Sequence, residues 1–313
     1  MVTAGRHGPR ARLLGVLLAF GLASCDASPV AWQRPNLLQP TPAGGLAIAD
    51  FHNHQIVVLG PTGAPQQRFG ELGLGPGQLW RIWGLLAGPD DRLIVLNRRL
   101  RSLADKRPLW EIKEFVRGVE VRAIRLPLPA PERPTLLAGP APAPDGGFFV
   151  GEGTAGLLLR YTADWQLVEQ RPAPRDGPPF GPISALRRRG DDLWLVEQYR
   201  HRVRRLAGDG RQLLLLEDEG SGPGELLFPA AVDCCPAQGW LAVADTGNLR
   251  VQRFDLQGRP LDGFSPAPAS PDRPVQLRDL LVSPDCSRLY LLDSTGNRLL
   301  VTTPQGELLQ VLP

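Results

Sequence analysis

Residues 240–258 read WLAVADTGNLRVQRFDLQG, and the pattern in this stretch predicts the fold of most of the chain. An apolar run ends at Asp245 and a tight turn follows. A second apolar run has Val251 six residues after that aspartate, and a glycine turn at Gly258 closes it. Short apolar runs between turn residues are typical of buried β-strands. We therefore interpret the stretch as two neighbouring strands of one sheet.

The same pattern occurs six times in the 313 residues. Six apolar runs each end in a polar residue, and these polar residues lie 47, 55, 45, 48 and 48 positions apart. They are Asp50, Asn97, Glu152, Glu197, Asp245 and Asp293. Each unit also has a short apolar segment before the pair and another after a glycine turn. Four strands in a repeat of roughly 40–50 residues are typical of a propeller blade. The sequence thus predicts an all-β, six-bladed β-propeller of four-stranded antiparallel blades.

The turn sequences resemble those of a known repeat family. Residues 244–255 with Gly258, and residues 49–56, resemble the centre of an NHL repeat. Residues 293–298 match it with the asparagine one place late, and the linkers at 73–79 and 220–226 resemble the family's connections between blades. The resemblance covers residues 36–313 and implies an NHL-type propeller. That family includes scaffolds, ligand binders and a few lyases, so the fold alone does not define an activity.

The amino terminus has the features of an export signal. Three arginines lie within residues 6–12, and an apolar run of 11 residues follows at 13–23. Since about 20 residues are needed to span a bilayer, this run is too short for a membrane anchor and fits a signal peptide. Residues 22–25, Leu-Ala-Ser-Cys, resemble the lipobox of bacterial lipoproteins. An ordinary signal peptide with a chance cysteine is the alternative.

These features predict a domain order and a location. We expect residues 1–24 to be a lipoprotein signal peptide, residues 25–35 a tether lipidated at Cys25, and residues 36–313 the propeller. The protein would then lie in the bacterial cell envelope, attached to a membrane by its N-terminal lipid and facing the periplasm or the cell exterior. Residues 1–24 hold three of the 35 basic residues and none of the 32 acidic ones, so the remaining chain is balanced in charge. We expect no nucleic-acid partner.

Few residues are candidates for catalysis or metal binding. The aspartates and asparagines after the apolar runs recur once per blade, so they are spread around the ring, and we interpret them as acceptors for backbone groups of turns. Histidines are scarce, at His52, His54 and His201 beyond the signal segment. The polar candidates on the innermost strands are Asn36, Ser184, Asp233, Arg278 and Asp279. A calcium ion needs six to eight oxygen ligands, so we expect no metal site here. We also expect no cofactor and assign no catalytic residue.

Two functions from different classes remain. The first, which we favour, is a binding scaffold for a protein or an envelope polymer. The second is an enzyme, a lyase or lactonase with a divalent metal in the central channel.

The second unit carries an insertion that supplies a candidate interaction surface. Loops bear function more often than strands, and tryptophan beside arginine is frequent at binding hot spots. We therefore predict a partner-binding loop formed by Arg98, Arg99, Arg101 and Trp110. The alternative is that this loop has diverged in sequence without acquiring a function. A second group of arginines, at 187–189 and 200–205, is expected to be offset by nearby acids.

Three cysteines lie beyond the lipobox, at Cys234, Cys235 and Cys286. An exported compartment permits disulfides. A bridge between Cys235 and Cys286 would join neighbouring units, and a bond between the adjacent Cys234 and Cys235 is the alternative. One thiol must remain free in either case.

Overall fold

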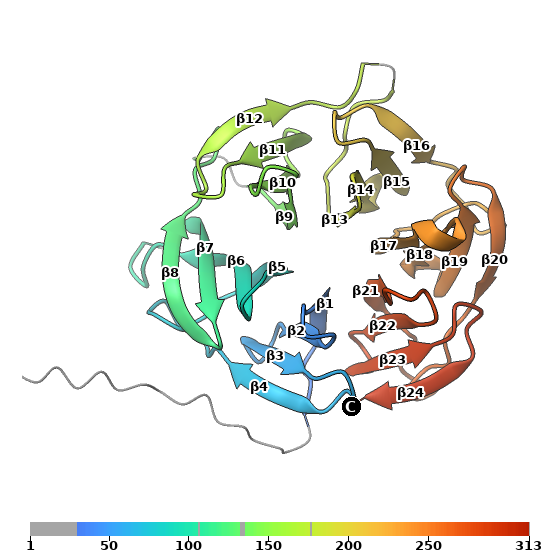
Figure 1. Ribbon diagram of the computed structural model, residues 1–313, viewed down its shortest axis with the longest axis horizontal. Helices are drawn as coiled ribbons and strands as arrows, with labels where there is room; N and C mark the ends of the chain where they lie inside the picture. The colour runs from blue at the N-terminus through green and yellow to red at the C-terminus, as the bar shows by residue number, and fades with distance from the viewer. Residues whose placement is uncertain (1–29, 106, 132–134, 176, 313) are drawn as a thin grey trace, which may run out of the picture.

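The computed structural model describes residues 30–105, 107–131, 135–175 and 177–312. In this part of the chain, 24 strands form six antiparallel sheets of four strands each. The sheets stand around a central axis like the blades of a propeller (Figure 1). The predicted fold class is therefore confirmed, and all six apolar runs that define the repeat lie in the second strand of a blade.

Each blade is built from one continuous segment. Blade 1 consists of β1 (Pro35–Pro40), β2 (Leu46–Asp50), β3 (Gln55–Leu59) and β4 (Pro65–Phe69). Blade 2 consists of β5 (Ile82–Ala87), β6 (Arg92–Leu100), β7 (Pro108–Val116) and β8 (Val119–Arg125). Blade 3 consists of β9 (Leu137–Pro142), β10 (Phe148–Glu152), β11 (Leu157–Tyr161) and β12 (Leu167–Arg171).

The second half of the ring repeats this order. Blade 4 consists of β13 (Ala185–Arg189), β14 (Asp192–Glu197), β15 (Arg202–Leu206) and β16 (Gln212–Leu216). Blade 5 consists of β17 (Ala231–Cys235), β18 (Trp240–Asp245), β19 (Arg250–Asp255) and β20 (Pro260–Phe264). Blade 6 consists of β21 (Leu277–Val282), β22 (Leu289–Asp293), β23 (Arg298–Thr302) and β24 (Leu308–Leu312). Three short 3-10 helices, η1 (Gln198–Arg200), η2 (Pro236–Gln238) and η3 (Thr246–Asn248), occupy turns of blades 4 and 5.

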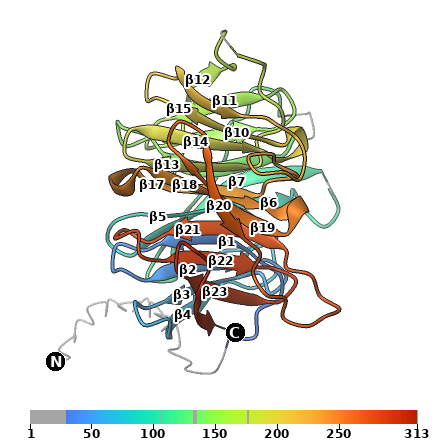
Figure 2. The same ribbon diagram turned by 90° about the vertical axis from the view of Figure 1, so that its right-hand side faces the viewer.

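The hydrophobic core lies between blades. Six clusters of buried apolar side chains each combine residues of two neighbouring blades. Seen from the side, the sheets are stacked against one another around the ring (Figure 2). This packing explains why the second strands are apolar on both faces, since each face of a blade is covered by a neighbour.

The ring closes where blade 6 meets blade 1. No strand is shared between the two sheets. Instead, Leu38 and Ile48 of blade 1 pack with Leu281 and Leu292 of blade 6. The backbone N–H of Leu38 also donates a hydrogen bond of 2.8 Å to Oδ2 of Asp279. Side-chain packing and this contact, rather than an exchanged strand, hold the first and last blades together.

The folded unit begins earlier than the expected boundary at residue 36. Val30 and Trp32 are buried in the cluster that joins blades 6 and 1. The backbone N–H of Gln33 donates to Oδ1 of Asp50 at 2.8 Å. Residues 30–35 are therefore part of the propeller and not of a tether, because alternate side chains find apolar cover there. The predicted signal peptide and Cys25 lie outside the described residues. None of the helices in the described part of the chain has the length and apolar character that crossing a bilayer requires.

Candidate functional site

One face of the ring carries the loops between second and third strands and the linkers between blades. We call it the mouth face. The aspartates that end the second strands hold these linkers in place. Asp245, for example, accepts a hydrogen bond from the N–H of Leu227 at 2.7 Å and another from Nδ2 of Asn248 at 2.8 Å. The expected structural role of these aspartates is confirmed, although their backbone donors lie mainly in the preceding linker and not in the following turn.

A cavity of about 290 Å³ occupies the central channel and opens on the mouth face. The innermost strand of every blade contributes to its wall: β1, β5, β9, β13, β17 and β21. Residues of the mouth-face loops, among them His52, Tyr199 and Ser294, surround its entrance. The cavity is thus built from segments that are far apart in the sequence, and only the closed ring creates it.

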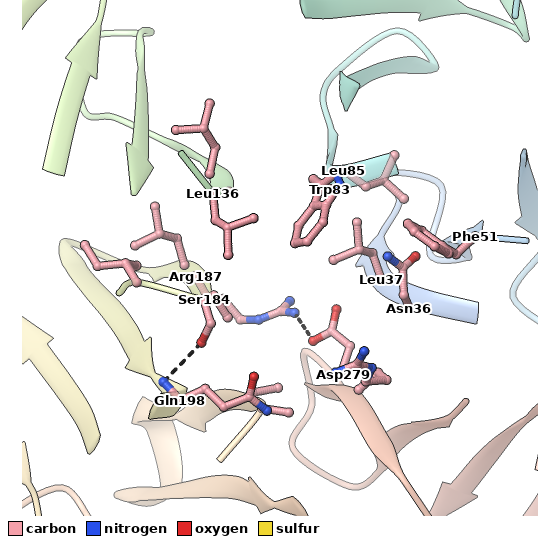
Figure 3. Close-up of a pocket in the computed structure, with 18 of the residues that line it drawn as sticks. Asn36, Leu37, Phe51, Trp83, Leu85, Leu136, Ser184, Arg187, Gln198 and Asp279 are labelled. Atoms are coloured by element: carbon pink, nitrogen blue, oxygen red, sulfur yellow. Dashed lines mark hydrogen bonds and ion pairs between the residues drawn. The ribbon is translucent and has the colours of Figure 1, made fainter. Parts of the chain in front are cut away.

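One side of the cavity is apolar. Trp83, Leu85, Leu136 and Leu37 form this side, and Figure 3 shows the ring of Trp83 pointing into the space between Leu136 and Leu37. Leu136 is 39% exposed although it lies at the channel, so it offers apolar surface that the described residues leave uncovered.

A charged pair crosses the channel at its inner part. Nη2 of Arg187 lies 2.9 Å from Oδ1 of Asp279, and both side chains are about nine-tenths buried (Figure 3). Asp279 also accepts the backbone N–H groups of Leu38 and Leu280, each at 2.8 Å. Burial raises the pKa of Asp279, and the charge of Arg187 and these two donors oppose that rise. The carboxylate is therefore fully engaged within the protein.

A second pair lies further along β13 and joins it to β17. Nε of Arg189 donates to Oδ1 of Asp233 at 2.6 Å, and Oδ2 of Asp233 accepts the N–H of Val282 at 2.8 Å. Blades 4, 5 and 6 are thereby connected around the channel, and Asp233 has no free oxygen for a ligand.

The entrance of the channel carries positive charge. Arg34 and Arg278 line the cavity and are exposed. Within the described residues neither side chain has an ion pair or a hydrogen bond. Of the residues that the structure describes, three arginines and one carboxylate, that of Asp279, line the cavity, so two positive charges have no counter-charge among them.

Two polar atoms of the channel wall are buried without a hydrogen-bond partner. They are Oδ1 of Asn36 and Nε1 of Trp83. The other end of the Asn36 amide donates to the carbonyl oxygen of Ile82 at 3.0 Å and so connects blade 1 to blade 2. Unsatisfied buried polar atoms are uncommon in folded proteins and are found where a water molecule or a ligand completes the site.

The donor atoms for a metal ion are not gathered in the channel. Among the described residues, no group of three or more His, Cys, Asp or Glu side chains could hold one. Of the inner-strand candidates, Asn36, Ser184, Arg278 and Asp279 line the cavity, whereas Asp233 is paired with Arg189. Ser184 is engaged with the backbone, since its Oγ donates to the carbonyl oxygen of Val196 at 3.0 Å. Positive charge at the entrance further disfavours a cation.

The insertion of blade 2 is a longer hairpin and not an irregular loop. Strands β6 and β7 have nine residues each and stay paired from Arg92 with Val116 to Leu100 with Pro108. The expectation that Trp110 lies on a loop is wrong, because it lies in β7, is only 5% exposed and packs edge-on against Trp83. Burial of a large aromatic surface drives this placement.

The three arginines of the predicted loop have different surroundings. The guanidinium of Arg98 lies 5.7 Å from the ring centre of Trp110, and burial lowers its pKa. Nε of Arg99 is 2.6 Å from Oε2 of Glu111, whereas Nε of Arg101 is buried without a partner. The most exposed apolar residue of the hairpin is Leu103, at 73%. Sequence reasoning missed Leu103, because a single leucine between turns carries no distinct signal.

The arginines of blade 4 are matched by acids, as expected from the composition of that segment. Arg202 pairs with Glu217 and Arg205 with Asp192 on the blade surface. The pair of Arg204 and Glu197 is not on the surface, because both side chains are fully buried, with Nε and Oε1 2.8 Å apart.

The structure contains one of the two disulfides considered. Cys235 and Cys286 are bonded and connect blade 5 to blade 6, and Cys234 is a buried free thiol. Burial, together with the nearby carboxylate of Asp233, raises the pKa of Cys234 to about 12.

The chain matches no protein-family profile and no curated protein. Solved structures are similar in fold. A streptogramin B lyase is 13% identical with a TM-score of 0.60, covering 90% of this chain and 84% of the lyase. A luciferin-regenerating enzyme is 14% identical with a TM-score of 0.58 and 84% coverage of both chains. The Cps50 (Swd1) β-propeller domain of Myceliophteria thermophila is 12% identical with a TM-score of 0.57, covering 88% of this chain and 97% of that domain. At these identities the similarity establishes the propeller fold alone.

Proposed function

We propose that this protein is a lipid-anchored, NHL-type propeller of the bacterial cell envelope, and that it binds a protein or an envelope component through its mouth face. The observation that carries the proposal is the channel entrance, where Arg34 and Arg278 are exposed without ion pairs and no cluster of metal ligands is present among the described residues. Such an entrance is suited to binding an anionic group and not to metal-assisted chemistry.

Two features support the cellular location. The lipobox-like residues 22–25 place a cysteine where a lipid would be attached. The disulfide between Cys235 and Cys286 fits an oxidising compartment, because such bonds rarely persist in the bacterial cytoplasm.

The β6–β7 hairpin is the part of the mouth face that the propeller fold does not require. It extends beyond the level at which the second strands of the other blades end, and its tip exposes Leu103. We assign partner contact to this tip and to Arg101. Trp110, Arg98 and Arg99 support the hairpin from its base.

A metal-dependent lyase or lactonase does not fit this channel. His52 is the one histidine that lines the described cavity, and the only carboxylate there, Asp279, is occupied by Arg187 and two backbone donors. Metal analysis of the purified protein tests this directly. Stoichiometric zinc or calcium that survives dialysis would reverse the preference.

Site-specific photo-crosslinking in the bacterial host tests the binding role. A photoreactive residue at Leu103 is expected to give a discrete crosslinked product. The same residue at Leu308, which is 53% exposed on the outermost strand of blade 6, is the matched control and should give none. Equal products at both positions, or none at Leu103, would contradict partner contact at the hairpin.

A Cys25→Ser variant is expected to leave the membrane fraction, and continued detergent partitioning would contradict lipid anchoring.

A further inference from the structure

We propose that the central channel binds one small amphipathic anion, with its charged head at Arg34 and Arg278 and its apolar body against Trp83, Leu85 and Leu136. This inference rests on the proposed function in treating the propeller as a binding module, and it specifies the class of ligand.

The charge of the cavity selects an anionic head. Arg34 and Arg278 lie at the entrance without ion pairs in the described part of the chain, and the only carboxylate of the cavity is neutralised by Arg187. An arginine can donate two parallel hydrogen bonds to a carboxylate or a phosphate, which makes it the preferred side chain for such groups. A cationic head would meet two uncompensated positive charges.

Arg187 adds donors deeper in the channel. Its contacts with Asp279 and with the carbonyl oxygen of Leu38 both use Nη2. Within the described residues, its Nε–H and its Nη1 group have no protein acceptor. These donors belong to a side chain that is nine-tenths buried, so they are held in a fixed direction.

The size and the opposite wall select a small ligand with an apolar body. A cavity of about 290 Å³ is at the lower limit of ligand pockets, which are roughly 300–1,000 Å³, so it fits one small molecule and not a polymer. Trp83, Leu85 and Leu136 provide an apolar surface on one side, and Leu136 remains 39% exposed there. An apolar chain that covers this side would gain about 25 cal/mol for each Å² removed from water.

The position of the entrance is consistent with a ligand from a membrane. The segment at residues 30–34 enters the fold on the mouth face, where the carbonyl oxygen of Gln33 accepts the N–H of His52 and the N–H of Arg34 donates to Asn297. Val30 is five positions after Cys25, and a fully extended chain covers no more than about 18 Å over that separation. A lipid at Cys25 would therefore hold the entrance close to the bilayer surface, where amphipathic anions are concentrated.

Calorimetric titration of the mature protein tests the proposal. The lipidated protein is held in phosphatidylcholine nanodiscs, or studied in plain buffer if it proves not to be lipidated. Sodium octanoate and octyl phosphate are the probes, and the stronger of the two identifies the head group. Saturable binding with one site per chain is expected. Octyltrimethylammonium tests the charge of the head, and acetate tests the contribution of the chain. Both should bind at least tenfold more weakly than octanoate.

Variants assign the binding to the channel. Arg278→Gln and Arg34→Gln are each expected to raise the Kd for octanoate about tenfold, since a hydrogen bond to a charged group contributes at least that much. Leu136→Asn should raise the Kd for octanoate and leave the Kd for acetate unchanged. Arg288→Gln is the matched control, because Arg288 is exposed, forms no ion pair within the described residues and does not line the channel. Circular dichroism and the melting temperature show whether each variant is folded.

The outcomes separate the two proposals. No saturable binding, equal binding of the cationic probe, or an unchanged Kd in both arginine variants would overturn the ligand assignment, whatever the crosslinking at Leu103 shows. Binding of octanoate with the expected variant pattern would support it even if Cys25 carries no lipid.

Discussion

Arg187 of blade 4 pairs across the central channel with Asp279 of blade 6, and 2.9 Å separates Nη2 from Oδ1. The two residues are 92 positions apart in the chain, and a hydrogen bond to Leu38 brings blade 1 into the same group. The pair therefore connects three blades at the point where the ring closes.

Removing one member of this pair should destabilise the protein strongly. Arg187→Met leaves the carboxylate of Asp279 buried without its counter-charge, and we expect the free energy of unfolding to fall by about 3–5 kcal/mol. Guanidinium unfolding measures this change. Arg288→Met, on the exposed surface, is the control. A loss below about 1 kcal/mol would show that the pair is not important for closing the ring.

Trp110 should behave as a core residue. Its burial and its contact with Trp83 predict that Trp110→Ala lowers the free energy of unfolding by about 3–5 kcal/mol. This revises the interpretation of Trp110 as part of a partner-binding loop. Leu103→Ala at the hairpin tip should change the same quantity by no more than about 0.5 kcal/mol. If Trp110→Ala unfolds with the same free energy as the wild type, Trp110 is not a core residue and its prediction as a binding residue stands.

The buried pair of Arg204 and Glu197 is suited to a double-variant experiment. Arg204→Met alone leaves a buried carboxylate unpaired and should lower the free energy of unfolding by about 3–5 kcal/mol. Glu197→Gln added to it removes that charge, while an amide oxygen can still accept the N–H of Gly181, which lies 2.6 Å from Glu197. The double variant should therefore be more stable than Arg204→Met. If it is less stable, the side chains act through packing and not through charge.

The disulfide between Cys235 and Cys286 should stabilise the folded protein. Cys235 and Cys286 are 51 residues apart, and closing a loop of that length in the unfolded chain corresponds to about 4 kcal/mol at 25 °C. Dithiothreitol should lower the melting temperature of the wild type and leave that of Cys286→Ala unchanged.

Cys234 provides an internal control for that experiment. Its raised pKa of about 12 keeps the thiol protonated at pH 8, and it is buried. Iodoacetamide should therefore label it only after unfolding. Rapid labelling of the native protein would contradict this description.

Asp285 should stabilise the folded protein at neutral pH and lose this effect in acid. Hydrogen bonds from the hydroxyl groups of Ser283 and Ser287, at 2.6 and 2.7 Å, lower its pKa to about 2. Because the folded pKa is below the unfolded value of 3.8, the contribution is complete above pH 3.8 and is lost as the pH falls towards 2. The group is exposed, so screening keeps this contribution small.

NMR titration of the Asp285 carboxyl carbon is the direct measurement. Ser287→Ala should move its pKa up towards the ordinary value, and Asp285→Asn should flatten the pH dependence of stability between pH 4 and 2. An unchanged pKa in Ser287→Ala would show that the hydroxyl is not the cause.

The repeat made the second strand of every blade predictable, because burial on both faces produces an apolar run whatever the neighbours are. Pairings across the ring were not predictable in this way. Asp279 and Arg278 are adjacent in the sequence, yet Asp279 is buried against Arg187, whereas Arg278 lies at the entrance with no ion pair to any described residue. A register irregularity between Leu277 and Asp279 interrupts strand alternation at this point, and both side chains line the cavity, so the sequence does not identify what each one meets.

Two local signals were present and were assigned to the wrong structures. Val30 and Trp32 are two positions apart, so both lie on one side of an extended segment, but their position after the lipobox favoured a tether. Trp110 is followed by Glu111 and Ile112, so the alternation of β7 already includes it. Because β6 and β7 lengthen together, the insertion keeps the side chains in strand register.

The contact between Leu38 and Asp279 joins residues 241 positions apart, and it has a consequence for the order of events during folding. A chain that emerges from its amino terminus presents blade 1 first, yet the partners of Leu38 and Ile48 belong to the last blade. One apolar side of blade 1 stays uncovered until nearly the whole chain has been delivered, and contacts of such long sequence separation form slowly. The first blade made is thus the last to be finished, and a chaperone that shields it during this interval would protect the protein when it is most prone to aggregate.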